Sequence, residues 1–453
     1  MSSALAYRPE SDRASQPARA RWSNSVLLAS SCVVLLFAPL AFGSVQPWSI
    51  FVLQAASTAL LLAWGLRQWS NHEIHFTPHP LYLPILSFLA LALVQWLAGL
   101  TAYRHATSSL LLLYLSYGIL AFVVTQTLRR SSQLDSLAWI LCGYGAAVSA
   151  LALLQGISSN GKLYWTWPLE QGGQMYGPYV NHNHYAGLME MLTPFPLVLA
   201  VSRFPRGNRR LVVAGVAALM ASTIFLSGSR GGMIAFAVQV TVLILLVRPY
   251  GAIAKQKVPV AIFLVFVVGF LVWLGGSELT RRLTSIQSET RQELSGGVRL
   301  TIDRDCLRMW WTRPVLGWGL GTFPVVYPQF RSFYTTFFVN DAHNDYLQLL
   351  VEAGLAGAAI ALWFLVVTFR RAKAKLDNWT ETANGTLTVA ALLGCIGILV
   401  HSFLDFNLQI PANAALFYVL CAIAAADPFQ ESQRRRVRRN HLIVEPPPES
   451  AEQ

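Results

Sequence analysis

Charged residues are scarce in this chain of 453 residues. Asp, Glu, Lys and Arg together make up 12 % of it, whereas ~25 % is usual in soluble proteins. A soluble protein of this length with so few charged residues could not cover its surface with polar groups. Hydrophobic residues make up 54 %, and the mean hydropathy is +0.45. The composition therefore excludes a soluble enzyme and indicates an integral membrane protein.

Cysteine and clustered metal ligands are scarce as well. Cys32, Cys142, Cys395 and Cys421 fall in apolar segments, and Cys306 lies in a polar segment without an obvious partner. No group of Cys and His residues has the spacing of a metal site. The sequence therefore predicts no structural disulfide, no metal site and no bound cofactor.

Long runs without charge are abundant instead. An apolar helix of roughly 20 residues is long enough to cross a bilayer. We predict an all-α integral membrane protein with about twelve transmembrane helices and a large, partly helical periplasmic loop between the ninth and the tenth. The expected spans are 25–42, 47–66, 82–101, 107–127, 136–156, 184–202, 211–227, 231–247, 258–275, 346–369, 385–404 and 410–426.

The positions of Lys and Arg orient these spans. With an even number of spans both termini lie on one side, and about two thirds of the Lys and Arg residues fall on that side. The positive-inside rule makes it the cytoplasm. The net charge of +12 then reflects a basic inner surface that faces anionic lipid, and we predict no nucleic-acid partner.

The sequence predicts a functional outer loop, disordered chain ends and a division of the chain into five parts. A loop of some 70 residues in a helical bundle is usually functional, and Asp303–Trp311 within it predicts a helix that ends before Pro314. The polar ends of the chain are expected to be disordered. The parts are a cytoplasmic arm (1–21), helices one to nine (22–275), the large periplasmic loop (276–345), helices ten to twelve (346–426) and a basic, proline-rich cytoplasmic tail (427–453).

Polar residues near the membrane gather in four clusters on the predicted outer side. In the first, Asn181 and Asn183 open a span, and Glu190 lies two turns further on the face of Asn183. An intramembrane carboxylate suggests function, and a helix cap with an interhelical hydrogen bond is the alternative. In the second, Arg230 stands where a helix N-terminus can help to hold an anion. A plain turn with a snorkelling arginine is the alternative there.

The third and fourth clusters flank the end of the large loop. The loop carries eight arginines and no lysine, among them Arg299, Arg304 and Arg308, which favours two-pronged recognition of phosphate or carboxylate. Most of the eight are expected to pair with acidic neighbours at the surface. The fourth cluster contains His343 at an expected helix start, where an imidazole can be neutral and act as a general base. On a continuous helix Gly354 would share the face of His343.

Motifs in these clusters resemble the O-antigen ligase-like superfamily of bacterial membrane glycosyltransferases, which also holds O-antigen and exopolysaccharide polymerases. One departure is Asp303, where a tryptophan is common in the family. The matching stretches, between about 176 and 357, are Asn181-x-Asn183-x-x-Ala186, Ser229-Arg230-Gly231, Arg299 followed by Pro314-x-x-Gly317-x-Gly319 and Phe323, and His343-Asn344 nine residues before Gly354-x-x-Gly357.

The resemblance implies a metal-independent, inverting glycosyltransferase of the bacterial inner membrane. The enzyme would move a glycan from undecaprenyl pyrophosphate to an acceptor hydroxyl at the periplasmic face, on lipid A–core in an O-antigen ligase. Arg230 and Arg299 would hold the pyrophosphate, and His343 would take the acceptor proton. Membrane lipids are the remaining partners. Other residues expected to bind substrate are Asn181, Asn183, Glu190, Asn344, Arg304 and Arg308.

Other functions stay open. Within the superfamily these are a glycan polymerase, in which the acceptor is a growing chain, and a protein O-oligosaccharyltransferase. A different class is a transporter or flippase for lipid-linked glycans, in which Glu190 and Glu352 would couple transport to ions. Such transporters usually show internal repeats and paired broken helices, and neither is visible in the sequence.

Overall fold

A computed structural model describes residues 18–72, 74–128, 130–168, 174–202, 208–247, 296–335 and 338–426. Over these residues the regular elements are helices, with two isolated β-bridges and no strand. The all-α prediction is therefore confirmed. The predicted ninth span (258–275), the start of the large loop and most of both polar ends lie outside the described residues.

Seven of the described helices are long and apolar enough to cross a membrane, so the protein is a multi-pass membrane protein. The predicted total of twelve spans stays a prediction. The seven helices are α2 (Pro47–Ser70), α4 (Arg104–Thr127), α5 (Ser131–Ile157), α8 (Asn208–Ser227), α9 (Arg230–Val247), α14 (Asp345–Lys373) and α15 (Ala383–His401). Shorter apolar helices are α1 (Ala18–Leu40), α3 (Tyr82–Leu97) and α16 (Pro411–Ala425).

The predicted span 184–202 consists of two helices, α6 (His182–Leu192) and α7 (Pro194–Val201). They meet at Thr193, directly before Pro194. A proline has no N–H to continue the hydrogen-bond ladder and its ring crowds the preceding turn, so the break falls where the sequence places Pro194. All but the last residue of this pair of helices is buried.

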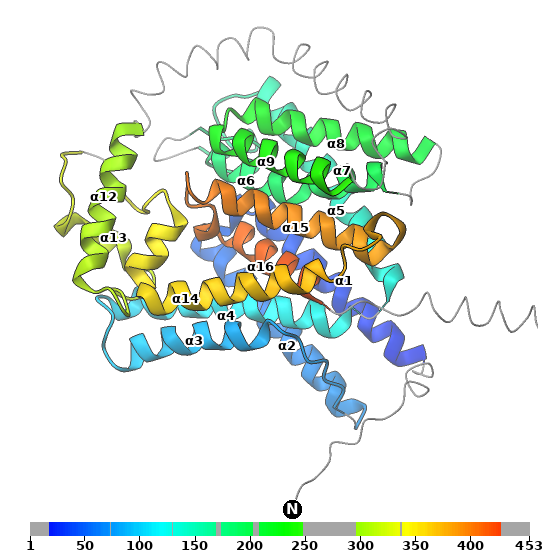
Figure 1. Cartoon of the computed structure of the whole chain (residues 1–453), viewed down its shortest axis with the longest axis horizontal. Coiled ribbons are helices and arrows are strands. Elements are labelled where there is room, and N and C mark those ends of the chain that lie inside the picture. Colours follow the sequence, from blue (N-terminus) through cyan, green and yellow to red (C-terminus); the bar gives the residue numbers. More distant parts are fainter. Residues whose placement is uncertain are drawn as a thin grey trace, which may run out of the picture.

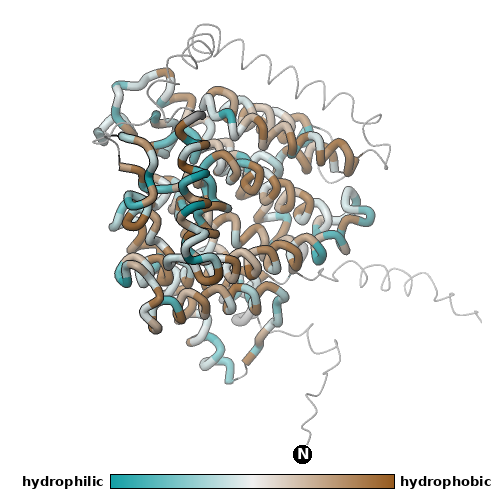
Figure 2. The backbone as a smooth tube through the Cα atoms, turned by 60° about the vertical axis from the view of Figure 1, so that its left-hand side comes forward, coloured by the Kyte–Doolittle hydropathy of each residue, from teal (hydrophilic) through white to brown (hydrophobic). Residues whose placement is uncertain are grey.

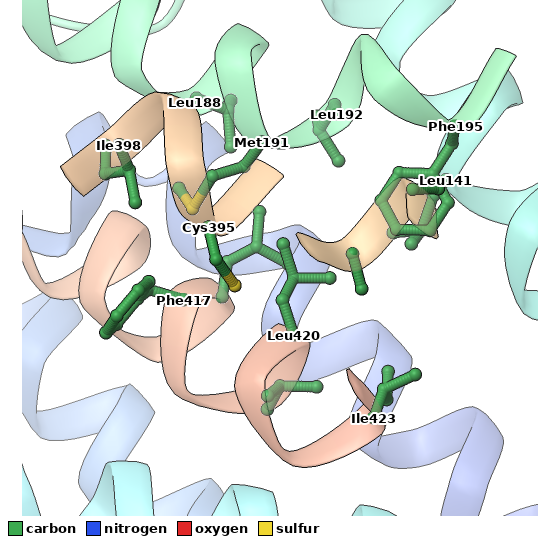
Figure 3. Close-up of a cluster of buried hydrophobic side chains, with 14 of the residues drawn as sticks. Leu141, Leu188, Met191, Leu192, Phe195, Cys395, Ile398, Phe417, Leu420 and Ile423 are labelled. Carbon is green, nitrogen blue, oxygen red and sulfur yellow. The ribbon is translucent and has the colours of Figure 1, made fainter. Parts of the chain in front are cut away.

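Helix α15 lies in the middle of the bundle (Figure 1). It contacts α6, α7 and α9 as well as α16. Figure 3 shows the apolar packing that holds it there: Met191 of α6 and Leu420 of α16 lie on opposite sides of Cys395. Because α15 is packed on several sides, the position of its last residue, His401, is fixed by the core.

Helix α12 (Gly296–Thr312) crosses one end of the bundle, roughly perpendicular to α14 and α15 (Figure 1). Figure 2 brings this end forward and shows hydrophilic residues there. Ile302, Cys306 and Met309 form one apolar face of α12 and pack against the short helix α13 (Phe323–Val326). The helix predicted over 303–311 is thus confirmed, and it starts early enough to include Arg299.

Helix α14 is broken at Gly354, whose φ is +62°. The break frees the carbonyl groups of Val351 and Glu352, which accept hydrogen bonds of 2.9 Å from the N–H groups of Trp318 and Gly319. The expectation that α14 is continuous, with Gly354 on the face of His343, was therefore wrong: the glycine makes a bend that a residue with a Cβ rarely adopts.

The segment 314–323 fills the break from the other side as well. Leu355 and Ala356, just after the bend, donate to the carbonyl groups of Pro314 (2.8 Å) and Val315 (3.0 Å). The carboxylate of Glu352 accepts from the N–H groups of Gly321 (2.9 Å) and Phe323 (3.1 Å). Backbone groups inside a membrane protein need such partners, so this segment and the bend in α14 form one hydrogen-bonded unit.

Candidate functional site

The turn of residues 402–410 joins α15 to α16 and includes a short 3-10 helix, η6 (Asn407–Gln409). Asp345, the first residue of α14, holds it in place: its carboxylate accepts from the hydroxyl of Ser402 (2.7 Å) and the N–H of Leu408 (3.0 Å). Residues from α6, α12 and the start of α14 contact the 402–410 turn. The candidate site is built around it.

His343 lies beside Asp405 of this turn, with 3.4 Å between its Nδ1 and Oδ1 of the carboxylate. His343 is outside the helix, because α14 is capped by Asn344, whose side chain accepts from the N–H groups of Tyr346 and Leu347. The φ of His343 is +54°, a conformation that costs roughly 1–2 kcal/mol for a residue with a Cβ. Backbone strain of this kind gathers at functional sites.

Asp405 is 1 % exposed. Burial alone would raise the pKa of its carboxyl, but the contact with His343 and the charges of His343, His184 and Arg299 hold that pKa well below its usual value. The carboxylate is therefore ionised throughout the range near neutral pH. A buried anion next to a histidine orients the ring and stabilises its protonated form, as general-base catalysis requires.

Arg299 places a positive charge at the same turn. Its Nη1 donates to the carbonyl oxygen of Leu404 over 3.0 Å, one residue before Asp405. Asp303 lies one helical turn after Arg299 on α12. Burial raises the pKa of its carboxyl, although the charges of Arg299 and His343 lower it. The residue that departs from the family pattern therefore lies within electrostatic reach of both Arg299 and His343.

Phe406 brings two histidines together. The rings of His184 and His343 pack edge-on against it, with centroid distances of 4.7 Å and 4.8 Å. His184 belongs to the first polar cluster and His343 to the fourth, so the turn joins two clusters that are far apart in the sequence. Asn181, in the same first cluster, caps α6 by accepting from the N–H of Asn183.

The second polar cluster also reaches this end of α15. Arg230 begins α9 with an exposed side chain. The next residue, Gly231, touches the imidazole of His401 so closely that a Cβ on it would overlap the ring. His182 contacts the carbonyl oxygen of Ser227 through Nδ1, at 2.8 Å. The clusters containing Asn183, Arg230, Arg299 and His343 are thus gathered at one end of the bundle.

Glu190 is buried away from solvent. Its Oε1 lies 2.8 Å from Nδ1 of His401, and the exposed fractions of the two side chains are 0 % and 1 %. Asn183, one of the other residues expected to bind substrate, is buried as well, at 7 %. The carboxylate of Glu190 therefore has a protein partner inside the bundle.

Arg304 and Arg308 lie on the exposed side of α12. Arg308 pairs with Asp305 at 3.6 Å, as expected for a surface arginine of this loop, and its side chain is 68 % exposed. Arg313 stacks on Trp318, 4.0 Å from the ring, and donates to the carbonyl oxygen of Leu100. Of these arginines and Arg299, Arg299 is the one hydrogen-bonded to the 402–410 turn.

Several buried polar atoms at the turn have no hydrogen-bond partner among the described residues. They are Nδ1 of His343, which lies near Asp405 without a hydrogen bond to it, Nε of Arg299, Nε2 of His184, Oδ2 of Asp405 and Nδ2 of Asn407. Unpaired buried polar groups are rare in folded proteins and call for a partner. Donors and an acceptor concentrated in one place suit a ligand that carries both hydroxyl groups and negative charge.

In the described part of the chain no three His, Cys, Asp or Glu side chains are grouped to hold an ion. The five cysteines are free and buried. Fixed positive charge at the site comes from arginines instead, with Arg299 at the turn and Arg230 at the start of α9. Arginine groups can stabilise a developing anion without a metal.

Sequence reasoning missed Asp405, Phe406 and His401. None of them belongs to the motifs that carried the family resemblance, and the turn between the last two spans looked like a short connection. A signal was present: His401 and Asp405 are ionisable residues at the end of an apolar span. The predicted topology also places that end on the same side as His343.

Comparison with known proteins bears on the family. No curated protein matches the chain significantly. The model of the O-antigen ligase family matches residues 215–362, a stretch that contains Arg230, Arg299 and His343 but not the segment around Asn183. The match confirms that the chain resembles the O-antigen ligase-like superfamily, whose members include membrane glycosyltransferases of the ligase and polymerase type.

Proposed function

We propose that the protein is a membrane glycosyltransferase that transfers a glycan from undecaprenyl pyrophosphate to an acceptor hydroxyl, as an O-antigen ligase does. The proposed location is the bacterial inner membrane, with both termini in the cytoplasm and the reaction at the periplasmic face. The family match to residues 215–362 supports the reaction class. The observation that carries the proposal is the pairing of His343 with buried, ionised Asp405 beside Arg299.

The reaction needs a base on one side of the anomeric carbon and a stabilised leaving group on the other. His343 takes the proton of the acceptor hydroxyl as its oxygen attacks the anomeric carbon, and Asp405 stabilises the imidazolium that forms. The bond from that carbon to the pyrophosphate oxygen breaks, and undecaprenyl pyrophosphate leaves as an anion. A single displacement of this kind inverts the configuration of the anomeric carbon.

Arg299 and Arg230 bind the pyrophosphate in this proposal. A guanidinium offers two parallel N–H donors to phosphate oxygens. Arg299 uses Nη1 for Leu404, and its Nε is buried without a partner, so a donor is left for a substrate. Since pyrophosphate is already an activated leaving group, the arginines need only hold it and balance its charge.

Other predicted contacts are kept as part of the proposal. Asn181 and Asn183 open α6 next to His184, where a sugar bound against Phe406 would pass. Asn344 precedes α14 beside His343. Arg304 and Arg308 lie on the exposed face of α12 and would meet the charged headgroup of an incoming lipid. In the ligase reading the acceptor is lipid A–core.

Purified protein in lipid vesicles tests the proposal. Wild-type protein should join a glycan on undecaprenyl pyrophosphate to an acceptor, without an ion gradient and in the presence of EDTA. His343→Ala should lower turnover by roughly 10²–10⁴-fold while donor binding stays nearly unchanged. Full turnover by His343→Ala would contradict the base assignment, and loss of transfer in EDTA that Mg²⁺ restores would contradict the role of the arginines.

The choice of acceptor separates the remaining functions. Transfer to lipid A–core supports the ligase, lengthening of the donor glycan itself supports a polymerase, and transfer to a serine- or threonine-bearing protein supports an oligosaccharyltransferase. Movement of the lipid-linked glycan across the vesicle membrane without any transfer would support the flippase instead. Transfer is favoured over transport here because the proposed base, its carboxylate partner and an arginine lie at one site.

A further inference from the structure

The buried pair of Glu190 and His401 has no part in the reaction proposed above. It joins α6 to the last residue of α15 through the 2.8 Å contact of Oε1 with Nδ1. Two buried ionisable groups are costly in a membrane protein unless they have a specific task. Their neighbours show what they hold together.

On one side, the pair contacts the first turn of α9. Gly231 fits against the ring of His401, and a Cβ on Gly232 would lie 3.1 Å from Oε1 of Glu190. Arg230 directly precedes these two glycines and starts the helix. The Glu190–His401 pair therefore fixes the backbone from which Arg230 extends.

On the other side, the pair holds the 402–410 turn. The carbonyl oxygen of His401 accepts from the N–H groups of Leu404 (2.8 Å) and Asp405 (3.1 Å). Leu404 is the residue whose carbonyl oxygen accepts from Arg299. One buried pair thus lies between the residue proposed to bind pyrophosphate, Arg230, and the residue that orients the base, Asp405.

We propose that Glu190 and His401 form a positioning pair that sets the distance between Arg230 and the Asp405–His343 pair, and so between the leaving group and the base. This inference rests on the proposed function. It gives Glu190 a task other than sugar binding and makes His401 a residue that acts through others. A misplacement of about 1 Å between reacting groups is enough to cost roughly 10²-fold in rate.

The test uses a variant that keeps the protein folded. Removing one partner leaves a buried unpaired group, so Glu190→Leu or His401→Leu alone is expected to unfold easily. Replacing both together with leucine is often neutral for the stability of a buried pair. We expect Glu190→Leu/His401→Leu to keep a wild-type melting temperature within a few degrees, yet to lower kcat and raise the donor KM, each by about 10-fold or more.

Conservative and control variants complete the design. Glu190→Gln keeps an acceptor for His401 and should recover most of the lost activity. Lys375→Met removes a buried group just beyond the last residue of α14, where Nζ donates to the carbonyl oxygen of Ala426 (2.7 Å). It should change the melting temperature without changing kcat or KM.

Two outcomes overturn the inference. In one, the double leucine variant is stable and has wild-type kcat and KM, which means that the pair serves the fold alone. In the other, Glu190→Gln is no better than the double variant, which means that the hydrogen bond to His401 does not set the geometry. Failure of the wild-type protein to transfer glycan or bind the lipid donor is a different result, and it would count against the proposed function.

Discussion

Arg299 donates a hydrogen bond to the main-chain oxygen of Leu404, 3.0 Å away. The bond connects helix α12, from the large loop, to the turn between α15 and α16. Arg299 and Asp405 are thereby held at one turn although 105 residues separate Arg299 from Leu404. A residue proposed to bind the leaving group and the partner of the proposed base share one anchoring point.

Asp405→Asn tests the pairing with His343. The pKa of Asp405 lies well below its usual value, because the charges of His343, His184 and Arg299 outweigh the effect of burial, so the substitution removes a permanent anion. That anion orients the imidazole and stabilises the imidazolium that forms during the reaction. We expect turnover to fall by about 10²-fold or more, and since the pKa of Asp405 lies far below neutrality, the loss should be present throughout the range from pH 5 to 9. A profile from pH 5 to 9 checks this, with exposed Asp377→Asn as the control.

Arginine-to-lysine substitutions test the donor site. An ammonium cannot donate to Leu404 and to a phosphate in the same fixed geometry, so Arg299→Lys should raise the Kd for the lipid donor by roughly 10–100-fold and lower turnover. Arg230→Lys should act in the same direction. Donor binding is measured directly, without acceptor. Losses confined to Arg304→Lys or Arg308→Lys would move the pyrophosphate site to the exposed face of α12.

Alanine at Gly354 or Gly319 tests the unit formed by the bent helix and segment 314–323. Gly354 and Gly319 have positive φ, +62° and +105°. A Cβ would overlap the main chain of Val315 in the first case and the side chain of Thr101 in the second. Each substitution should destabilise by about 2 kcal/mol or more, and lower the melting temperature. Gly143→Ala in α5 has open space around it and should be neutral or slightly stabilising. Equal melting temperatures for all three would contradict the account.

Reporter fusions test the membrane topology. The distribution of Lys and Arg predicts that fusions after Arg210 and Arg371 report from the cytoplasm and a fusion near Ser295 from the outside. The contact of His343 with Asp405 requires that the start of α14 and the end of α15 lie on one side. A cytoplasmic signal near Ser295 would reverse the orientation and move the site to the inner face.

Hydropathy predicted the seven described helices that are long and apolar enough to cross a membrane, because each is a charge-poor segment of sufficient length. Reasoning from sequence spacing failed where the backbone conformation of one residue interrupts a helix. The spacing from His343 to Gly354 matches three helical turns, but Gly354 adopts a positive φ and the helix bends there. The motif therefore indicated that a glycine is needed at position 354. Only the structure shows that this glycine breaks the helix.

The candidate site was half visible in the sequence. Arg230, Arg299 and His343 stood out because each is a charged or ionisable residue within a recognisable motif. Asp405 did not, since a single acidic residue in a short connection is common, and its importance comes from burial beside His343. Contacts between residues this distant in the chain depend on how α12, α14 and α15 pack, which no local pattern encodes.

The bend at Gly354 divides α14 into two pieces with different surroundings. Residues 345–353 are held by the 402–410 turn and by segment 314–323, whereas residues 355–373 form a largely apolar helix with a basic last turn. Both pieces are hydrogen-bonded to segment 314–323, which accepts from Leu355 and Ala356 and donates to Val351 and Glu352. At the bend, the two pieces of this membrane helix are therefore joined through a segment of the large loop and not through the helix's own hydrogen-bond ladder.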